Sequence, residues 1–572
     1  MATPCMTDST LQGLDYFDLV IRQALAVKLG ADVDDYKLER PRNEKLGDFA
    51  LPCFRFAQSA GKNPAELANY LAEELKLNEI SAAATGPFLN FTINRTALAR
   101  RVCADCSRED YGDGNASGCV VIEYSSPNIA KPMHVGHLRS TVIGASLARL
   151  ASKSGHEVVR INHIGDWGSQ FGKLVAAWNR WGKQSDLELD PIGHLLDLYV
   201  RFHQLEKEDA ELEVEARAAF RELESGEENQ TREIWRCFTE LSMREFKQTY
   251  ERLGSEFDFI RGESWYEDKL DDTLDWLESC GITEEDDGAT LVKLDDLGIK
   301  TPCLVKTTHG TTLYATRDLA AARSRWDEFG FERMLYIFGS EQSLHFQQFS
   351  AVLSKGGCEW SERMEHIPFG LIRLAEGKLS TREGRVLTLK EVLDRAVVLA
   401  GEIIEEKNPE LSGKDQVAEM VGVGAIIFHD LKHQRQKDVV FDWKEVLSFE
   451  GDTGPYLQYT HARCCAILRK SGRELPDLEQ VDPSHLADSP ELMVALGRYP
   501  VALREAWEKR EPMVLATYLL KLGAAGNFFY KDKRVLGSGD GVEDARLYAI
   551  DILRRTLVAG LTILGVPTPE EM

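Results

Sequence analysis

A strand–helix–strand pattern between residues 119 and 165 narrows the folds open to this chain more than any other feature. The apolar run CVVIEYSS at 119–126 is typical of a buried parallel strand. A loop with prolines follows, then the helical pattern HVGHLRSTVIGASLARLASKSG at 134–155 and a second apolar run, EVVRINHIG. This is the opening unit of a doubly wound, Rossmann-like nucleotide-binding sheet. Apolar runs at 333–342 and 365–372 predict its second half, so we expect an α/β fold.

Two further parts flank this predicted domain. On the N-terminal side, Asn63 is a suitable cap for a helix that begins at Pro64, and residues 86–94 alternate as in a half-buried strand. On the C-terminal side, residues 511–530 and 544–566 have the periodicity of long helices, which predicts a helical bundle. The expected domains are 1–112, an N-terminal additional α/β domain; 113–390, the nucleotide-binding domain; 391–454, a helical connecting region; and 455–572, a C-terminal α-helical bundle.

Charge is distributed unevenly along the chain. The formal net charge of the 572 residues is −25, which by itself disfavours a nucleic-acid partner. Between Lys183 and Lys300, however, 33 Asp and Glu stand against 14 Lys and Arg, so this stretch carries −19 and the remainder only −6. We therefore expect an acidic insertion at about 183–300 with helices of its own. A local basic face elsewhere remains compatible with the composition.

Cysteine content and hydropathy bear on metal binding and location. Of the 11 Cys, only Cys103 and Cys106 form a C-x-x-C pair, with no second pair to complete a zinc site, so no zinc is expected. The first residues lack the basic start and apolar run of a signal peptide, and no stretch approaches the ~18 apolar residues of a membrane helix. The sequence therefore predicts a cytoplasmic protein with free thiols and no membrane partner.

The densest group of candidate functional residues is SSPNIAKPMHVGHLRST at 125–141, where the first strand ends and the first helix begins. Ligands bind at this position in α/β sheets, and the helix N-terminus offers N–H groups to phosphate. His134 and His137 share a helix face, while Gly136 leaves room for a flat base to approach the backbone. With Lys131, the two imidazoles would neutralise a phosphate during its transfer, without a covalent intermediate.

Two other segments combine charge with possible ligand contacts. KLSTREGR at 378–385 is a polar loop that can close over a phosphate and open for product release, although alone it equally fits a solvated surface turn. In the C-terminal part, YLQYTHAR and FFYKDKR interleave aromatic residues with cations, as single-stranded RNA binding requires, although such aromatics are also typical of a helix core. The candidate RNA-binding residues are Tyr456, Tyr459, Arg463, Phe528 and Lys531.

HVGH and KLSTR resemble the HIGH and KMSKS signatures of class I aminoacyl-tRNA synthetases, in the same order along a split nucleotide-binding sheet. INHIGDWGSQFG, LYATRDLAA, GSEQSLHFQQ and DARLYAIDILRRTLVAGLTILGVP resemble the arginyl-tRNA synthetases in particular, and the resemblance covers nearly the whole chain. It implies formation of arginyl-adenylate from L-arginine and ATP with Mg²⁺. It also implies esterification of the 2′-hydroxyl of the terminal adenosine of tRNA(Arg).

For ATP, the resemblance implies that the two histidines contact the phosphates and that the glycine between them packs against adenine. A lysine and a serine of the second signature would belong to a moving loop. Thr381 stands where KMSKS has its second lysine, and by resemblance Lys131 compensates for it. The implied ATP-binding residues are Gly136, His134, His137, Lys378 and Ser380, and the implied catalytic residues are Lys131, His134, His137 and Lys378.

For arginine, the resemblance implies that Asp318 binds the guanidinium group, assisted by Tyr314 one helical turn earlier. A carboxylate offers two acceptors to a planar guanidinium, a fit that lysine lacks, so the site would discriminate without editing. The implied arginine-binding residues are Glu123, Ser126, Pro127, Asn128, His134, Tyr314, Asp318 and Gln342.

For tRNA, the resemblance implies that the N-terminal domain binds the elbow and the C-terminal bundle binds the anticodon, in a monomeric enzyme. Other interpretations stay open on sequence alone: another HIGH-bearing synthetase, a nucleotidyltransferase, or a non-catalytic tRNA-binding paralogue. A nucleotidyltransferase has no need of the large C-terminal bundle, and a non-catalytic paralogue has no need of Lys131, His134, His137 and Lys378 together.

Overall fold

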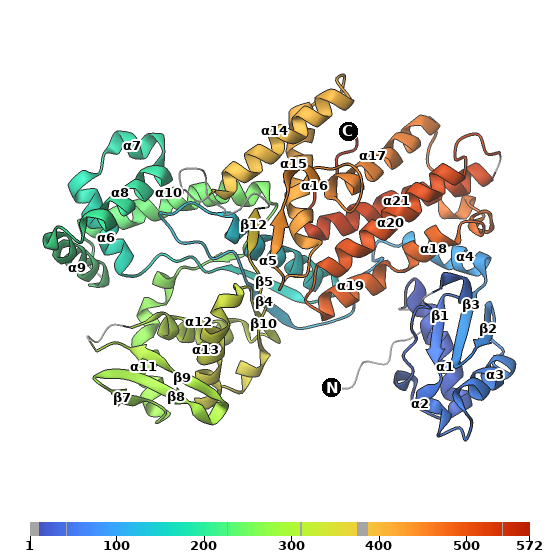
Figure 1. Cartoon of the computed structure of the whole chain (residues 1–572), viewed down its shortest axis with the longest axis horizontal. Helices are drawn as coiled ribbons and strands as arrows, with labels where there is room; N and C mark the ends of the chain where they lie inside the picture. Colours follow the sequence, from blue (N-terminus) through green and yellow to red (C-terminus); the bar gives the residue numbers. More distant parts are fainter. Residues whose placement is uncertain (1–10, 42, 226, 309–311, 375–386, 540) are drawn as a thin grey trace.

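The computed structural model describes residues 11–41, 43–225, 227–308, 312–374, 387–539 and 541–572. Figure 1 shows a central parallel sheet from which the other parts extend. An N-terminal domain and a group of helices from the acidic stretch lie at opposite ends of the long axis, and a helical bundle lies between the sheet and the N-terminal domain. No helix in these ranges is long and apolar enough to span a bilayer.

The N-terminal domain is an antiparallel sheet covered by helices. Its elements are α1 (Leu14–Leu29), β1 (Phe49–Pro52), α2 (Phe54–Ala57), α3 (Pro64–Glu74), β2 (Ile80–Thr85), β3 (Phe88–Ile93) and α4 (Arg95–Cys106). Asn63 accepts from the backbone N–H of Glu66 at 2.9 Å, and the Glu66 carboxylate accepts from the N–H of Asn63. This capping box, with Pro64 at the first helical position, confirms the predicted start of α3.

Five parallel strands form the central sheet within the described residues. They are β4 (Cys119–Glu123), β5 (Glu157–Asn162), β6 (Phe259–Ile260), β10 (Arg333–Tyr336) and β11 (Met364–His366), in the order β11–β10–β4–β5–β6. Helix α5 (Val135–Lys153) connects β4 to β5, which confirms the predicted strand–helix–strand unit. Because β5 and β10 lie on opposite sides of β4, the carboxyl ends of these three strands surround the position where doubly wound sheets bind ligands.

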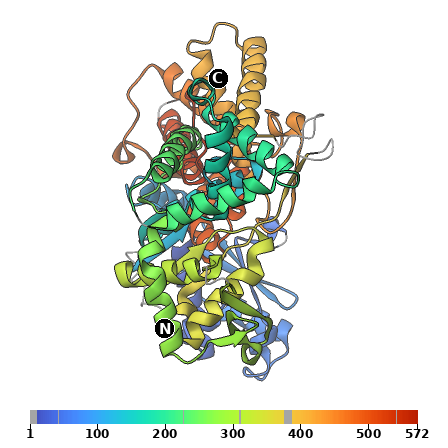
Figure 2. The ribbon, with the colours of Figure 1, turned by 90° about the vertical axis from the view of Figure 1, so that its left-hand side faces the viewer.

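The acidic stretch carries helices, as the sequence predicts, but it also contains strands that the sequence did not predict. Its two-residue strand β6 pairs with β5 in the central sheet, and so short a strand leaves no periodic signal in the sequence. After β6, an unpredicted antiparallel sheet follows, and Figure 2 shows the helices before β6 above this small sheet. Helix α6 (Ser169–Trp181) precedes the stretch. The further elements are α7 (Gln184–Leu189), α8 (Pro191–Leu205), α9 (Ala210–Glu224), α10 (Gln230–Arg252), α11 (Leu270–Ser279), β7 (Glu284–Asp286), β8 (Ala289–Leu294) and β9 (Ile299–Lys306).

The second half of the sheet leads into the C-terminal half of the chain through a strand pair. Here α12 (Tyr314–Phe329) precedes β10, and α13 (Ser343–Lys355) follows it. Only the start of the apolar run at 365–372 belongs to the central sheet; its end begins β12 (Ile372–Leu374), which pairs in parallel with β13 (Val439–Phe441). Strand β13 interrupts a region predicted as helical. The helices around it are α14 (Leu389–Lys407), α15 (Lys414–Leu431) and α16 (Trp443–Val446).

A fully buried arginine ties these parts together. Arg139, on α5, forms an ion pair with Asp430 of α15, with Nε 2.8 Å from the carboxylate. The same guanidinium donates to the backbone carbonyls of Gly370, before β12, and Lys437, before β13. The start of the central sheet, the strand pair and the C-terminal half therefore share one buried cation.

The remaining helices form the C-terminal bundle that the sequence predicts. They are α17 (Gly454–Ser471), α18 (Pro490–Gly497), α19 (Tyr499–Glu508), α20 (Met513–Asp532) and α21 (Val542–Leu564). Helices α19 and α21 pack against α5, and α18 packs against α4. The bundle thus contacts both the central sheet's first helix and the N-terminal domain.

Candidate active site

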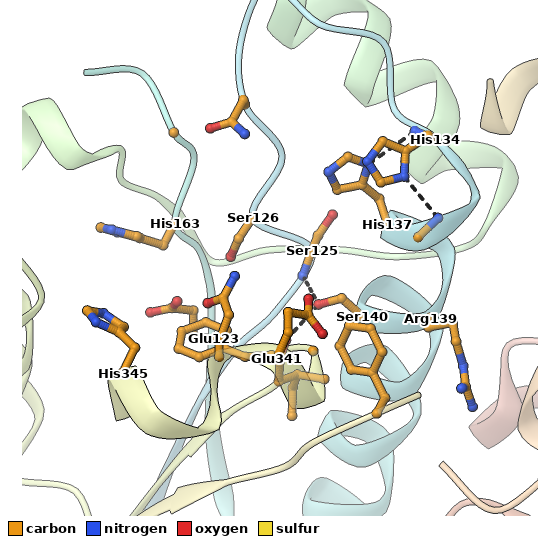
Figure 3. A pocket seen from close by; sticks show the side chains of 18 of the residues that line it. Glu123, Ser125, Ser126, His134, His137, Arg139, Ser140, His163, Glu341 and His345 are labelled. Carbon is orange, nitrogen blue, oxygen red and sulfur yellow. Dashed lines mark hydrogen bonds between the residues drawn. The ribbon is translucent and has the colours of Figure 1, made fainter. Parts of the chain in front are cut away.

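A cavity of about 710 Å³ opens at the carboxyl ends of β4, β5 and β10. Figure 3 shows side chains from the start of α5 and from the strand ends pointing toward it. Nine of the predicted site residues line it: Glu123, Ser126, Asn128, His134, Gly136, His137, Tyr314, Asp318 and Gln342. Of the others, Pro127 and Lys131 are not part of the lining, and Lys378 and Ser380 fall outside the described residues.

His134 and His137 cap the helix that they begin. The backbone N–H of Gly136 donates to Nδ1 of His134 at 3.0 Å, and the N–H of His134 donates to Nδ1 of His137 at 3.1 Å. Two N–H groups of the first turn are therefore satisfied by imidazoles, where a hydroxyl and a carboxylate usually serve. Because each Nδ1 accepts, the proton of each neutral ring is on Nε2, which is the donor available to a ligand.

Both rings are neutral near pH 7. Burial lowers the pKa of His137 to about 3, and His134 lowers it further, since the ring centroids are only 4.0 Å apart. Loss of surrounding water also lowers the pKa of His134. In this neutral state the pair offers hydrogen-bond donors to a phosphate.

Gly136 lies against one of these histidine rings. A Cβ atom at this position would be 2.7 Å from Cε1 and 2.9 Å from Nδ1 of His134. Atoms that close repel one another, so any side chain at position 136 would push the ring out of its capping position. The absence of a side chain therefore protects the orientation of His134, in addition to the predicted access for a base.

The loop after β4 has a strained backbone. Ser125, Ser126 and Ala130 have φ angles of 74°, 48° and 60°, a left-handed region that costs non-glycine residues about 1–2 kcal/mol each. Buried hydrogen bonds hold this conformation: the Ser125 N–H donates to Oγ of Ser140 at 2.9 Å, and the Ser126 N–H donates to Oδ1 of Asn162 at 3.1 Å. This backbone conformation brings Ser125 and Ser126 to the wall of the cavity.

Helix α10, from the acidic stretch, supports the same loop. The Tyr250 hydroxyl lies 2.8 Å from Oγ of Ser125 and accepts from Nδ2 of Asn162 at 3.0 Å. Oγ of Ser242 accepts from the backbone N–H of Ala130 at 2.9 Å. No sequence signal marks these two residues, because single hydroxyls on an amphipathic helix are common. The acidic stretch therefore contributes directly to the support of the site.

The predicted arginine-binding residues of this loop differ in exposure. Oγ of Ser126 is buried and has no hydrogen-bond partner in the described part of the chain, whereas Asn128 is exposed at the cavity. Pro127 is buried, and its carbonyl accepts from the N–H of Gly165 at 3.0 Å. Pro127 therefore shapes the loop and does not line the cavity, which corrects its expected place.

Lys131 lies beside the acidic stretch. Its Nζ is 4.7 Å from the centre of the Tyr199 ring on α8 and 3.5 Å from Oε1 of Gln170 on α6. Burial lowers the pKa of this ammonium group. To reach a phosphate at the start of α5, the side chain has to turn away from both contacts.

Tyr314 and Asp318 lie one turn apart on α12 and both line the cavity, as their spacing predicts. The Asp318 carboxylate is hydrogen-bonded to Nε2 of His345 on α13 at 2.5 Å. Burial works to lower the pKa of His345, but the hydrogen bond and the charge of Asp318 raise it on balance. His345, which the sequence did not single out, therefore gives Asp318 a hydrogen-bond partner, and the contact favours the protonated form of the imidazole.

A second carboxylate, Glu263, lines the cavity near Asp318. Burial raises the pKa of Glu263 to about 8, although Arg317, 3.8 Å away, works to lower it; the charge of Asp318 raises it further. Among the residues that the structure describes, Oε2 of the Glu263 carboxylate is buried and has no hydrogen-bond partner. A cation with several N–H donors would satisfy this oxygen and favour the ionised form. Glu263 was missed because it lies in a stretch crowded with other carboxylates.

Glu123 is already engaged by another residue. Its carboxylate forms an ion pair with Arg325 of α12, and the two side chains are 2% and 1% exposed. Arg325 also lies 3.3 Å from Nδ1 of His163, which follows β5. Glu123 and His163 line the cavity and Arg325 does not, so the arginine supports the cavity wall without facing the ligand space.

The predicted RNA-binding residues gather on the C-terminal bundle. Arg463 donates to the hydroxyls of Tyr459 and Tyr530, and its guanidinium carbon lies 4.9 and 5.3 Å from the centres of these rings. Phe528 is 57% exposed but is not part of the groove lining. Four of the five predicted residues line one groove of about 500 Å³: Tyr456, Tyr459, Arg463 and Lys531.

Within the described ranges, no group of three or more His, Cys, Asp or Glu is arranged to hold a metal ion. Cys103 and Cys106 are buried in α4, and burial raises the pKa of Cys103 to about 12, so its thiol is protonated. These cysteines belong to the packed core.

The parallel sheet with paired histidines at its switch point has counterparts in known families. The family described as "tRNA synthetases class I (R), catalytic domain" matches residues 108–443. The "DALR anticodon binding domain" matches residues 457–572, and the "Arginyl tRNA synthetase N terminal domain" matches residues 17–93. Fold and site together define a class I aminoacyl-tRNA synthetase.

Individual relatives extend over almost the whole chain. Arginine–tRNA ligase 2 of Bacillus anthracis is 45% identical over 542 residues, covering 94% of this chain and 95% of that protein. Arginine–tRNA ligase of Ligilactobacillus salivarius is 43% identical over 561 residues, covering 97% and 98%. The arginyl-tRNA synthetase of Thermus thermophilus matches in structure with a TM-score of 0.82 and 29% identity, covering 98% of this chain and 100% of that one. The chain belongs to the arginyl-tRNA synthetase family, whose class uses ATP.

Proposed function

We propose that the chain joins L-arginine to tRNA(Arg) in two steps within the cavity at the ends of β4, β5 and β10. In the first step, the arginine carboxylate attacks the α-phosphorus of ATP, bound as its Mg²⁺ complex; arginyl-adenylate forms and pyrophosphate leaves. In the second step, the 2′-hydroxyl of the terminal adenosine attacks the arginyl carbonyl, loses its proton and displaces AMP. Membership of the family supports this reaction.

The observation that carries the proposal is the meeting of two opposite kinds of group in one cavity. On one side, His134 and His137 line the cavity at the start of α5, and their Nε2–H groups, left available by the Nδ1 contacts, suit phosphate oxygens. On the other side, the carboxyl groups of Asp318 and Glu263 suit a planar cation. Arginyl-adenylate carries a phosphate at one end and a guanidinium group at the other.

The arginine substrate would be held at three points. Asp318 and Tyr314 take the guanidinium group, and Glu263 ionises to become a second acceptor beside them. Glu123 suits the α-ammonium group, because it is the acidic residue at the end of β4. Further polar contacts to the amino and carboxylate groups fall to Ser126, Asn128, His134 and Gln342.

The ATP phosphates would receive positive charge from lysines, since the histidines are neutral. In this proposal Lys131 turns from Tyr199 toward the phosphates, and Lys378 with Ser380 closes over them, as the resemblance implies. Gly136 packs against adenine while leaving His134 in place. Catalysis then consists of positioning and electrostatic stabilisation.

The tRNA would contact the chain at both ends. Residues 1–112 form the part that binds the elbow, residues 113–390 the catalytic part, residues 391–454 the connection, and residues 455–572 the anticodon-binding part. The groove with Arg463 between two tyrosine rings supports stacking of unpaired bases. We further propose that the enzyme is a cytoplasmic monomer.

The test is pyrophosphate exchange with a panel of amino acids, with and without tRNA. Exchange with arginine, and not with lysine or glutamine, is the expected result. Asp318→Asn should raise the KM for arginine, and Lys131→Ala should mainly slow adenylate formation. Exchange with another amino acid, or equal loss of ATP affinity in both variants, contradicts the proposal.

A further inference from the structure

We propose that Arg325 is a positioning residue that fixes α12 against Glu123 and thereby sets the length of the amino acid that the cavity accepts. The inference rests on the proposed function, because it concerns the same cavity. It adds a determinant of specificity that does not itself touch the substrate.

The first observation is the place of Arg325 on α12. Asp318 and Arg325 are seven residues apart, which is close to two full turns, so they lie on one face of the helix about 10 Å apart along its axis. Asp318 lines the cavity, whereas Arg325 is 1% exposed and lies behind its wall. Helix α12 therefore carries Asp318, which lines the cavity, and Arg325, which fixes the helix, on the same side.

The second observation is the set of elements that Arg325 contacts. Its guanidinium group pairs with Glu123 of β4 and approaches Nδ1 of His163, beyond β5, at 3.3 Å. The rings of Tyr266 and Tyr336 lie 5.8 and 5.9 Å from its guanidinium carbon, and Tyr336 belongs to β10. One side chain thus fixes α12 relative to all three strands whose ends form the cavity.

The consequence concerns the distance between the two ends of a bound arginine. Glu123 suits the α-ammonium group, and Asp318 with Tyr314 suits the guanidinium group. The gap between them depends on where α12 lies along its axis relative to β4. Because the ion pair is buried, water cannot replace either partner, so a helix that slides leaves a charge unpaired. The pair therefore favours one spacing, and with it one side-chain length.

The experiment compares Arg325→Lys and Arg325→Met with the same changes at Arg323, on the same helix. Arg323 contacts α11 through Thr273 and the Trp276 ring, and it does not line the cavity. Steady-state kinetics are measured with arginine, with homoarginine, which is one methylene longer, and with the analogue one methylene shorter. Loss of one buried charge contact should raise the KM for arginine about tenfold or more at Arg325 and leave the KM for ATP unchanged.

The decisive readout is the ratio of kcat/KM for arginine to that for the two analogues. We expect it to fall about tenfold in Arg325→Lys and to stay unchanged in both Arg323 variants. A merely structural role would lower kcat and thermal stability without changing this ratio, and that result would overturn the inference. If wild-type protein does not use arginine at all, the proposed function fails instead, so the two failures are distinguishable.

A second set of variants keeps the test decisive if Arg325→Met does not fold. The double variant Glu123→Gln/Arg325→Gln removes both charges and leaves no unpaired one. It should fold, bind arginine weakly and lose the length preference. A wild-type length preference in the double variant counts against the inference.

Discussion

At the start of α5, two neutral imidazole rings cap the helix, so the properties of these two residues determine how the site can bind a phosphate. Each imidazole uses Nδ1 for the helix's own N–H groups, which fixes both the ring orientation and the nitrogen that carries the proton. The cavity therefore needs no ionisation of His134 or His137 to bind a phosphate. In the proposed reaction, the positive charge is therefore assigned to Lys131 and Lys378.

Replacing Gly136 with alanine should show whether the position of the His134 ring affects activity independently of the stability of the protein. The added Cβ would displace His134 and remove one phosphate donor, so adenylate formation should slow by about 100-fold with little change in thermal stability. Gly401→Ala is the matched control, because a Cβ there meets only an ordinary contact at 3.7 Å. Pyrophosphate exchange and thermal unfolding are measured for both. A Gly136→Ala protein as active as the control would show that the ring position does not matter.

Glu263 should make arginine binding depend on pH. Its pKa of about 8 means that it is mostly protonated below pH 8, and a cationic ligand favours the ionised form. The KM for arginine should therefore fall as pH rises from 6 toward 8, by up to about tenfold per pH unit, and level off above. Glu263→Gln should abolish this dependence and raise the KM at pH 8. The other charged groups facing this site are Asp166, Arg317, Asp318 and His345.

Sequence reasoning found residues that carry a local signal and missed those defined by distant contacts. His134 and His137 were found because their spacing places them on one helix face, whereas Tyr314 and Asp318 were found through the family resemblance, with which their spacing agrees. Glu263, His345 and Arg325 have no such spacing, and their roles depend on segments that only the fold brings together. Pro127 was placed in the cavity because it adjoins Ser126 in the motif, although its contact is with the backbone of Gly165.

At the scale of elements, the acidic stretch does more than add charge to the surface. The sequence reveals its composition, but the strand β6 is too short to predict and the hydroxyls of α10 look ordinary. In the fold, α10 supports the strained loop after β4 through Tyr250 and Ser242. The boundaries of the acidic stretch, which were predicted from charge, therefore mark a change in composition and do not coincide with the boundaries of a structural unit.

Tyr250→Phe should weaken both the fold and the site. Removing the hydroxyl leaves Ser125 and Asn162 with lost buried hydrogen bonds, which should lower the free energy of unfolding by about 1–3 kcal/mol. The KM for arginine should rise because the loop after β4 loses its support. Tyr70→Phe, at an exposed position of the N-terminal domain, should change neither quantity. Urea denaturation and aminoacylation kinetics provide the measurements, and a loss of stability with an unchanged KM would show that α10 does not act on the loop.

At the scale of the whole molecule, the proposed tRNA-binding groove and the proposed active site lie in separate parts of the chain. A substitution can therefore weaken binding at one of them and leave the other unchanged. Arg463→Ala should raise the KM for tRNA about tenfold, since one base stacked on this surface contributes about 1–3 kcal/mol. The KM values for arginine and ATP at saturating tRNA should not change. Arg473→Ala is the control, because Arg473 pairs with Glu543 and Asp544 elsewhere on the bundle. Equal effects of the two variants would show that the groove has no specific role.

The buried cation Arg139 limits how this chain can be divided. Cutting between the nucleotide-binding part and the later helices would strip it of Asp430 and of the Lys437 carbonyl at once, leaving an uncompensated charge inside the remaining fragment. The predicted domain boundary near residue 390 is therefore a poor choice for separate expression, because it separates Arg139 from both partners. Chimeras with a relative should exchange α5, α15 and the β12–β13 pair as one block.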